Sequence, residues 1–112
     1  GIINDEAIRT AHKKFGNRVL TGDEVRWGFE NLNITQERLK EIGAFGFMQP
    51  IKLSCADHEG GGPVLFQQWN GEKWVMTGIV VQPMKKFVRE MIEKSAAKYA
   101  KENKIKIKKD CN

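Results

Sequence analysis

Apolar residues recur at helical spacing through the first 42 positions, which predicts three helices in succession. The first helix covers about residues 3–15. The second begins at Thr21, because Thr21 and Glu24 form the capping-box pattern that satisfies free backbone groups at a helix start. The third helix is short, begins at Thr35 and ends at Gly43.

The pattern changes to alternation after Pro50, which predicts a short strand there. Segments 63–69 and 73–81 are rich in β-branched and aromatic residues and predict two further strands. Between them Asn70-Gly71 favours the positive φ angles of a type I′ turn, so a β-hairpin is expected. The glycine-rich segment 54–62 before the hairpin is predicted to be a loop.

A long helix is predicted from Pro83, which suits a first helical turn. Its apolar stripe consists of Met84, Phe87, Val88, Met91, Ile92, Ser95 and Tyr99. The element order contains no βαβ unit, and a hairpin alone is only marginally stable in water. The pattern therefore predicts an α+β arrangement that forms part of a larger fold.

Composition narrows the class of protein. The chain has 112 residues, of which 40% are hydrophobic and 29% charged, so it can bury a core. We find neither a stretch long enough to cross a bilayer nor a signal-peptide pattern. The net charge of +5 arises in residues 85–112, which carry ten Lys/Arg and four Asp/Glu. One interpretation is a small stand-alone basic module that binds nucleic acid or an acidic partner through residues 85–109; the simpler one is a solvated helix face and tail.

Candidate chemistry is sparse. His58 lies between two acidic residues, but His12 is the only other histidine, so too few ligands exist for a metal site. Cys55 and His58 are close in sequence, yet a loose glycine-rich loop would hold them and no activated nucleophile is recognisable. We therefore expect neither an enzyme nor a cofactor.

Longer stretches of the sequence resemble one protein family. The matching segments are Glu6–Ala11, Leu20–Gly28, Glu30–Leu32, Gly46–Lys52, Ser54–Gly60, Gln67–Gly71, Met91–Tyr99 and Lys109–Cys111. In order and spacing these resemble the C-terminal portion of the periplasmic substrate-binding protein of branched-chain amino acid ABC transporters, a type I periplasmic binding protein in its longer form.

The resemblance implies an α+β fragment of a two-lobed α/β protein. Its divisions are 1–53, a helical segment of the first lobe; 54–62, a hinge or crossover loop; 63–81, a β-hairpin of the second lobe; 82–103, the C-terminal helix; and 104–112, a basic tail. Asp57, His58, Glu59 and Gly60 become hinge-loop candidates. In an oxidising periplasm Cys55 and Cys111 could form a disulfide.

The resemblance also implies a function. Such a receptor captures branched-chain or related amino acids for an ABC importer and docks on a membrane permease, without catalysis, metal, cofactor or nucleic acid. The family's ligand-holding residues lie outside this chain, so the chain by itself should not bind an amino acid. Because it would lack the surfaces that cover its apolar faces, we expect the isolated chain to self-associate, with the long helix or the hairpin exchanged between copies.

Overall fold

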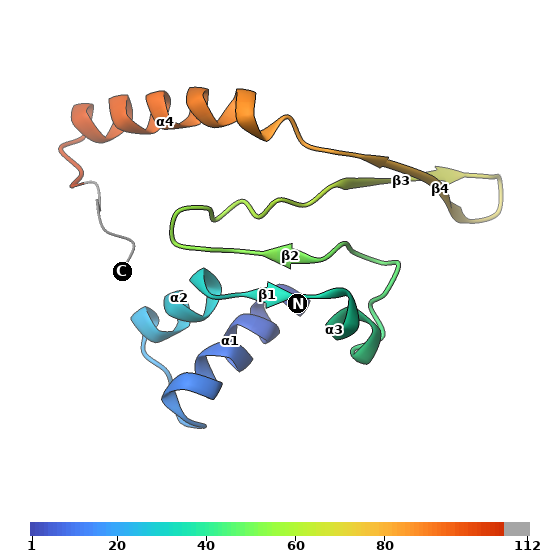
Figure 1. The fold of residues 1–112 in the computed structure, drawn as a ribbon, viewed down its shortest axis with the longest axis horizontal. Coiled ribbons are helices and arrows are strands. Elements are labelled where there is room, and N and C mark those ends of the chain that lie inside the picture. The colour runs from blue at the N-terminus through green and yellow to red at the C-terminus, as the bar shows by residue number, and fades with distance from the viewer. Residues whose placement is uncertain (107–112) are drawn as a thin grey trace.

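The computed structural model describes residues 1–106 and contains, within that range, four helices and two antiparallel strand pairs. In chain order the elements are α1 (Ile2–Phe15), α2 (Gly22–Glu30), β1 (Asn33–Ile34), α3 (Gln36–Glu41), β2 (Ile51–Lys52), β3 (Val64–Trp69), β4 (Trp74–Val81) and α4 (Lys85–Glu102). Figure 1 shows two parts. We call residues 1–53 the body, and residues 63–102, with the hairpin and α4, the arm.

Local capping explains where the helices of the body begin. The Thr21 hydroxyl accepts from the backbone N–H of Glu24 at 3.3 Å, and the Thr21 N–H donates to Glu24 Oε2 at 2.8 Å. Arg18 donates to the same carboxylate, and the pKa of Glu24 is lowered to about 2, chiefly by this bond. Thr35 caps α3 through its hydroxyl alone, which accepts from the Arg38 N–H at 3.2 Å. Both predicted helix starts are confirmed.

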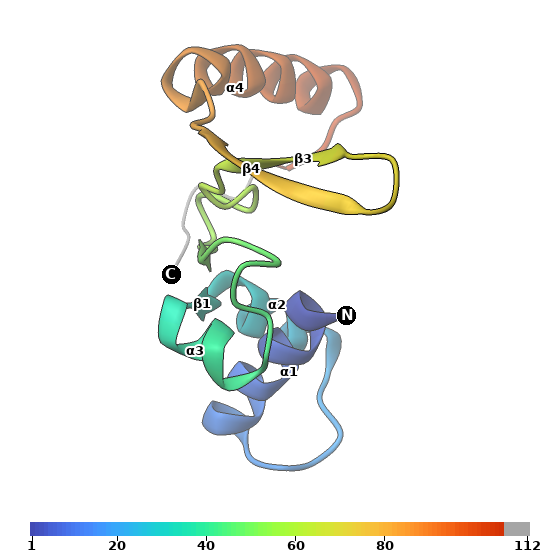
Figure 2. The same cartoon turned by 90° about the vertical axis from the view of Figure 1, so that its right-hand side faces the viewer.

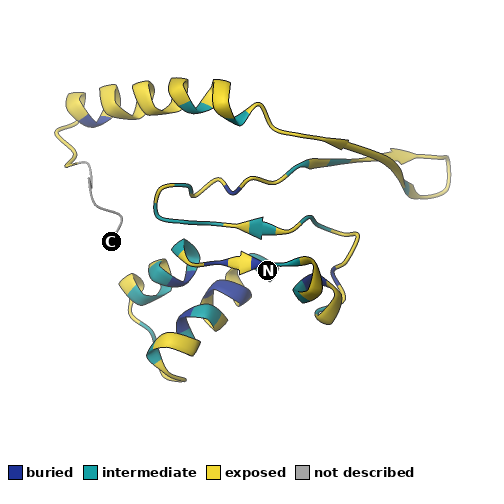
Figure 3. Ribbon diagram, in the orientation of Figure 1, coloured by how far each residue is buried: buried dark blue, intermediate teal, exposed yellow. Residues whose placement is uncertain are grey.

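The small hydrophobic core lies in the body, where Figure 3 shows most of the buried positions. Its members are Ala7, Leu32, Ile34, Leu39 and Ala44. At Gly28 helix α2 approaches α1 so closely that a Cβ would lie 2.3 Å from the carbonyl oxygen of Ala7. A glycine is therefore required for the contact between α1 and α2.

The strand predicted after Pro50 is present as β2, and its partner was not predicted. β1 pairs antiparallel with β2, with Ile34 opposite Ile51. The Leu53 N–H extends this pairing by donating to the Leu32 carbonyl at 2.9 Å. β1 is only two residues long, which is too short for an alternating pattern to reveal it.

The turn of the β3–β4 hairpin differs from the prediction. The loop contains four residues, 70–73, because Trp69 pairs with Trp74. Among the described residues Lys104 alone of the non-glycines has positive φ, so Asn70 does not adopt the type I′ conformation. Instead the Asn70 side-chain oxygen accepts from the N–H groups of Glu72 and Lys73 at 3.0 and 2.9 Å. An asparagine side chain commonly closes a turn in this way.

The arm is almost uncovered. Figures 1 and 2 show the hairpin and α4 extending along one side of the molecule, with no second layer beyond them. The predicted apolar stripe of α4 exists but faces outward: Phe87 is 67% exposed, Met91 60% and Tyr99 61%. The radius of gyration is 17.5 Å, against about 13 Å for a compact chain of this length. The predicted basic tail lies largely at residues 107–112, outside the described part.

Candidate functional site

The loop between the body and the arm contains the residues that the sequence singled out. It starts with a tight turn in which the backbones of Ser54 and Asp57 exchange two hydrogen bonds of 3.0 and 3.1 Å. Gly60 has a φ of +67°, and a Cβ at this position would lie 2.8 Å from the side chain of Ile51. The loop is therefore held against β2, and only glycine fits at Gly60.

Asp57 is the centre of the loop's polar contacts with α4. Its carboxylate forms an ion pair with Lys85 and lies 3.9 Å from Arg89 Nη1. Lys85 also donates to the Gly60 carbonyl at 3.1 Å, and Arg89 donates to the Ala56 carbonyl at 2.6 Å. The hydrogen bond from Lys85 is the main cause of the lowered pKa of Asp57. We call this set of contacts the Asp57 clamp.

His58 and Glu59 occupy different surroundings. The His58 ring nitrogen Nε2 lies 3.4 Å from Glu30 Oε1 at the end of α2, although the His58 side chain is 64% exposed. The Glu59 N–H donates to Asp57 Oδ1 at 3.2 Å and so shapes the loop. The structure therefore brings Asp57, Glu59 and Gly60 together, while His58 turns toward the body.

Two open depressions border the Asp57 clamp. The larger, of about 380 Å³, is lined by Pro50, Lys52, Leu53, Ser54, Asp57, Gly61 and Lys85. The smaller, of about 220 Å³, is lined by Glu59, Gly60, Gly62, Pro83, Met84, Lys85 and Val88. Lys85 is common to both, and its charge is already matched by Asp57. Within residues 1–106 no group of three or more His, Cys, Asp or Glu side chains is arranged to hold a metal ion.

This arrangement is suited to positioning one part of the chain on another. The Asp57 clamp joins the loop to the first turns of α4, and the His58 ring lies 3.4 Å from Glu30 in α2. From the sequence we did not predict that Lys85 and Arg89 contact Asp57. Nor did we predict that Glu30 lies beside His58. Lys85 and Arg89 are four positions apart on a predicted helix and so share a face, but nothing in the pattern shows that this face meets Asp57.

Of the two cysteines in the predicted disulfide, Cys55 lies among the described residues. There is no free cysteine in the described part of the chain, which includes Cys55. Cys111 lies outside the described residues. The pairing of Cys55 with Cys111 therefore stays a prediction.

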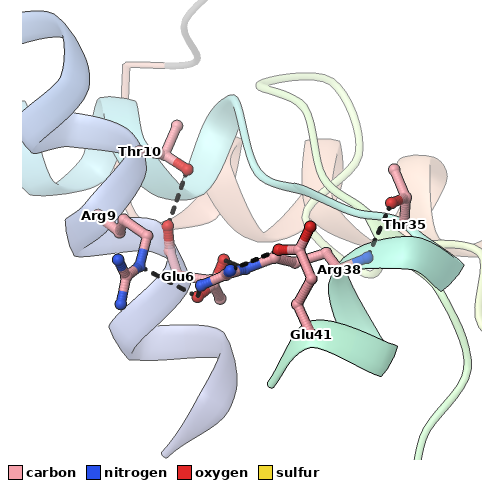
Figure 4. Close-up of polar contacts among 6 residues, drawn as sticks. All are labelled: Glu6, Arg9, Thr10, Thr35, Arg38 and Glu41. Atoms are coloured by element: carbon pink, nitrogen blue, oxygen red, sulfur yellow. Dashed lines mark hydrogen bonds and ion pairs between the residues drawn. The ribbon is translucent and has the colours of Figure 1, made fainter. Parts of the chain in front are cut away.

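A second polar cluster, shown in Figure 4, joins α3 to α1 within the body. Arg38 donates two hydrogen bonds to the Glu6 carboxylate, at 2.9 Å from Nε and 2.7 Å from Nη2. Glu6 is only 9% exposed, and the bond to Arg38 is the first cause of its lowered pKa. Arg38 also donates to Glu41 at 2.8 Å. This ion pair with two hydrogen bonds links two helices of the body. None of its residues belongs to the Asp57 clamp.

The basic segment 85–109 is less available to an outside partner than its charge count indicates. Lys85 pairs with Asp57 and Arg89 with Glu93, the latter at 2.8 Å. Residues 107–109 lie outside the described part. Two of the cations on which a nucleic-acid interface would depend are therefore already paired.

Comparisons with known proteins give one clear relation. No protein-family model matches the chain, and no curated protein matches it. A solved structure, described as the crystal structure of an ABC transporter permease from the Pseudomonas fluorescens group, matches with a TM-score of 0.89 and 46% sequence identity. The match covers 99% of this chain and 26% of that chain. The chain thus spans about a quarter of the length of the structure it resembles.

This comparison corrects the family resemblance drawn from the sequence. The matching structure is described as a permease and not as a substrate-binding protein, so the assignment to a periplasmic binding protein is wrong. The α+β class stands, as four helices and two antiparallel strand pairs that match a portion of the permease structure. Within residues 1–106 we find no helix with the length and hydropathy needed to cross a bilayer.

Proposed function

We propose that the chain serves in ABC-type transport, as one part of a larger transporter component. The observation that supports this role is the 46% identity, at a TM-score of 0.89, across 99% of the chain. Identity at this level over nearly every residue is far above what a shared fold alone produces. The proposal concerns the general transport role, because the relation covers 26% of the matching protein.

Within this proposal the chain catalyses no reaction and contributes scaffold. The Asp57 clamp sets the direction of α4 relative to the loop and the body. Residues for solute recognition would lie in the remaining part of the larger protein. The periplasmic side is the location we propose, and a branched-chain or related amino acid is the first solute class to test.

Uptake by intact cells tests the transport role. We would delete the gene that encodes this chain and follow the uptake of radiolabelled leucine, then of a panel of other amino acids and amides. Loss of at least one uptake activity, restored by the gene in trans, is the expected result. Uptake of a sugar by an unrelated transporter is the control. Unchanged uptake of every solute in the panel would argue against amino acid transport. Unchanged growth of the deletion strain on every single nitrogen source would argue against a role in import.

A further inference from the structure

Two apolar surfaces of the arm are largely uncovered within the described part of the chain. The first is the outward stripe of α4, formed by Met84, Phe87, Val88, Met91, Ile92 and Tyr99. The second is the hairpin, whose exposed apolar side chains are Val64, Phe66, Trp69, Trp74, Met76, Ile79, Val80 and Val81. We call them together the open apolar surface.

The hairpin is apolar on both of its faces. Val80 and Val81 are adjacent in β4 and pair in register with Leu65 and Val64, so their side chains point to opposite faces. Val80 is 47% exposed and Val81 48%. A strand with consecutive exposed apolar residues is typical of a sheet that is covered on both sides. The β3–β4 sheet also has only two strands, which leaves an unpaired edge on each.

The exposed area supports the same conclusion. A compact protein of 12.8 kDa exposes about 6,300 Å², whereas this chain exposes 8980 Å². The excess, roughly 2,700 Å², is about three times the area that one partner loses in an interface of standard size. An excess of this size is better explained if the chain packs into a larger protein than if it makes a single docking contact.

We propose that the open apolar surface docks onto the remaining three-quarters of a polypeptide like the matching ABC permease chain. The match supports this occupant, because this chain superimposes on that structure with a TM-score of 0.89 while covering 26% of it. The open arrangement of hairpin and α4 is thus found within a longer chain. The partner has to supply apolar surface for α4, cover for both hairpin faces and strands for the hairpin edges. This inference rests on the structural match and not on the transport role.

A reconstitution experiment tests the docking. We would co-express this chain with the Pseudomonas fluorescens-group protein lacking its matching quarter, and measure the mass of the product by light scattering. A 1:1 complex is expected, and Met91→Lys should weaken it at least tenfold. Ala97→Lys is the matched control, because it introduces the same residue on the opposite side of α4 and should change the affinity less than twofold. Val80→Lys and Val81→Lys should each weaken the complex, since they test the two hairpin faces separately.

A second experiment joins the two parts in one polypeptide, so that its result does not depend on the folding of a truncated partner. Here this chain replaces the matching quarter in the full-length relative, and the thermal midpoint is measured. Met91→Lys should lower the midpoint by about 5 °C or more, and Ala97→Lys by less than about 2 °C. Equal small shifts for both variants, or a chain that pairs only with itself in the presence of the partner, would overturn the proposal. Neither readout uses uptake, so failure here is distinct from failure of the transport role.

Discussion

Gly28 shows how one residue determines the contact between two helices. A Cβ at this position would lie 2.3 Å from the backbone oxygen of Ala7, which is an atom that cannot rotate away. Gly28→Ala should therefore lower the free energy of unfolding by about 2 kcal/mol, despite the better helix propensity of alanine. Urea unfolding followed by circular dichroism measures this. Gly22→Ala is the control, because open space surrounds Gly22, and an equal loss in both variants would contradict the packing argument.

The ion pair of Glu6 and Arg38 makes stability depend on pH. The pKa of Glu6 is lowered in the folded state, so its contribution is present above the unfolded pKa, about 4.3, and is lost as the pH falls through the folded pKa. Glu6→Gln should cost about 2 kcal/mol at pH 7, because it removes the buried carboxylate that pairs with Arg38.

Urea unfolding at pH 7 and pH 3 checks this prediction. The difference between wild type and Glu6→Gln should narrow at pH 3, because below about pH 4.3 the unfolded state takes up a proton at Glu6 and the contribution of the folded carboxylate declines. Glu41→Gln alters the other partner of Arg38, whose side chain is 63% exposed, and should cost less than about 0.5 kcal/mol. A difference that is the same at both pH values would rule out the ionic explanation.

At the scale of elements, the Asp57 clamp connects the loop to α4. Lys85→Gln removes the ion pair with Asp57 and the hydrogen bond to Gly60, so the loop should open more often. We expect hydrogen exchange in residues 54–62 to become about threefold to tenfold faster, as measured by mass spectrometry. Lys86→Gln changes the adjacent exposed lysine and should leave the exchange rates unchanged. Equal acceleration by both variants would mean that the clamp does not hold the loop.

Elements with local signals could be predicted from the sequence, and those set by distant contacts could not. The helix starts at Thr21 and Thr35 depend on residues within one turn, so the capping pattern sufficed. β1 exists because β2 lies beside it, which no two-residue pattern can reveal. At Asn70 the side-chain oxygen accepts backbone hydrogen bonds and closes a four-residue loop. This loop takes the place of the type I′ turn expected of an Asn-Gly pair.

The candidate site was predictable only in part. The glycine pattern predicted the loop, and the family resemblance made Asp57 and Gly60 candidates within it. Their partner Lys85 belongs to an element whose direction is set by tertiary packing. The component of the transporter was also wrongly assigned. Short matching segments indicate a relation to ABC transport, but they do not say which component contains them.

At the scale of the whole molecule, the open apolar surface should make the isolated chain self-associate. In the absence of a larger partner, Phe87, Met91 and Tyr99 can leave water only by meeting another copy. Sedimentation velocity at tens of micromolar should therefore show a dimer or a larger species. Met91→Lys should shift the distribution toward monomer by lowering the association constant at least tenfold, while Ala97→Lys should not. A wild-type chain that sediments as a monomer at this concentration would contradict the prediction, because about 2,700 Å² of excess surface would then remain stably exposed to water.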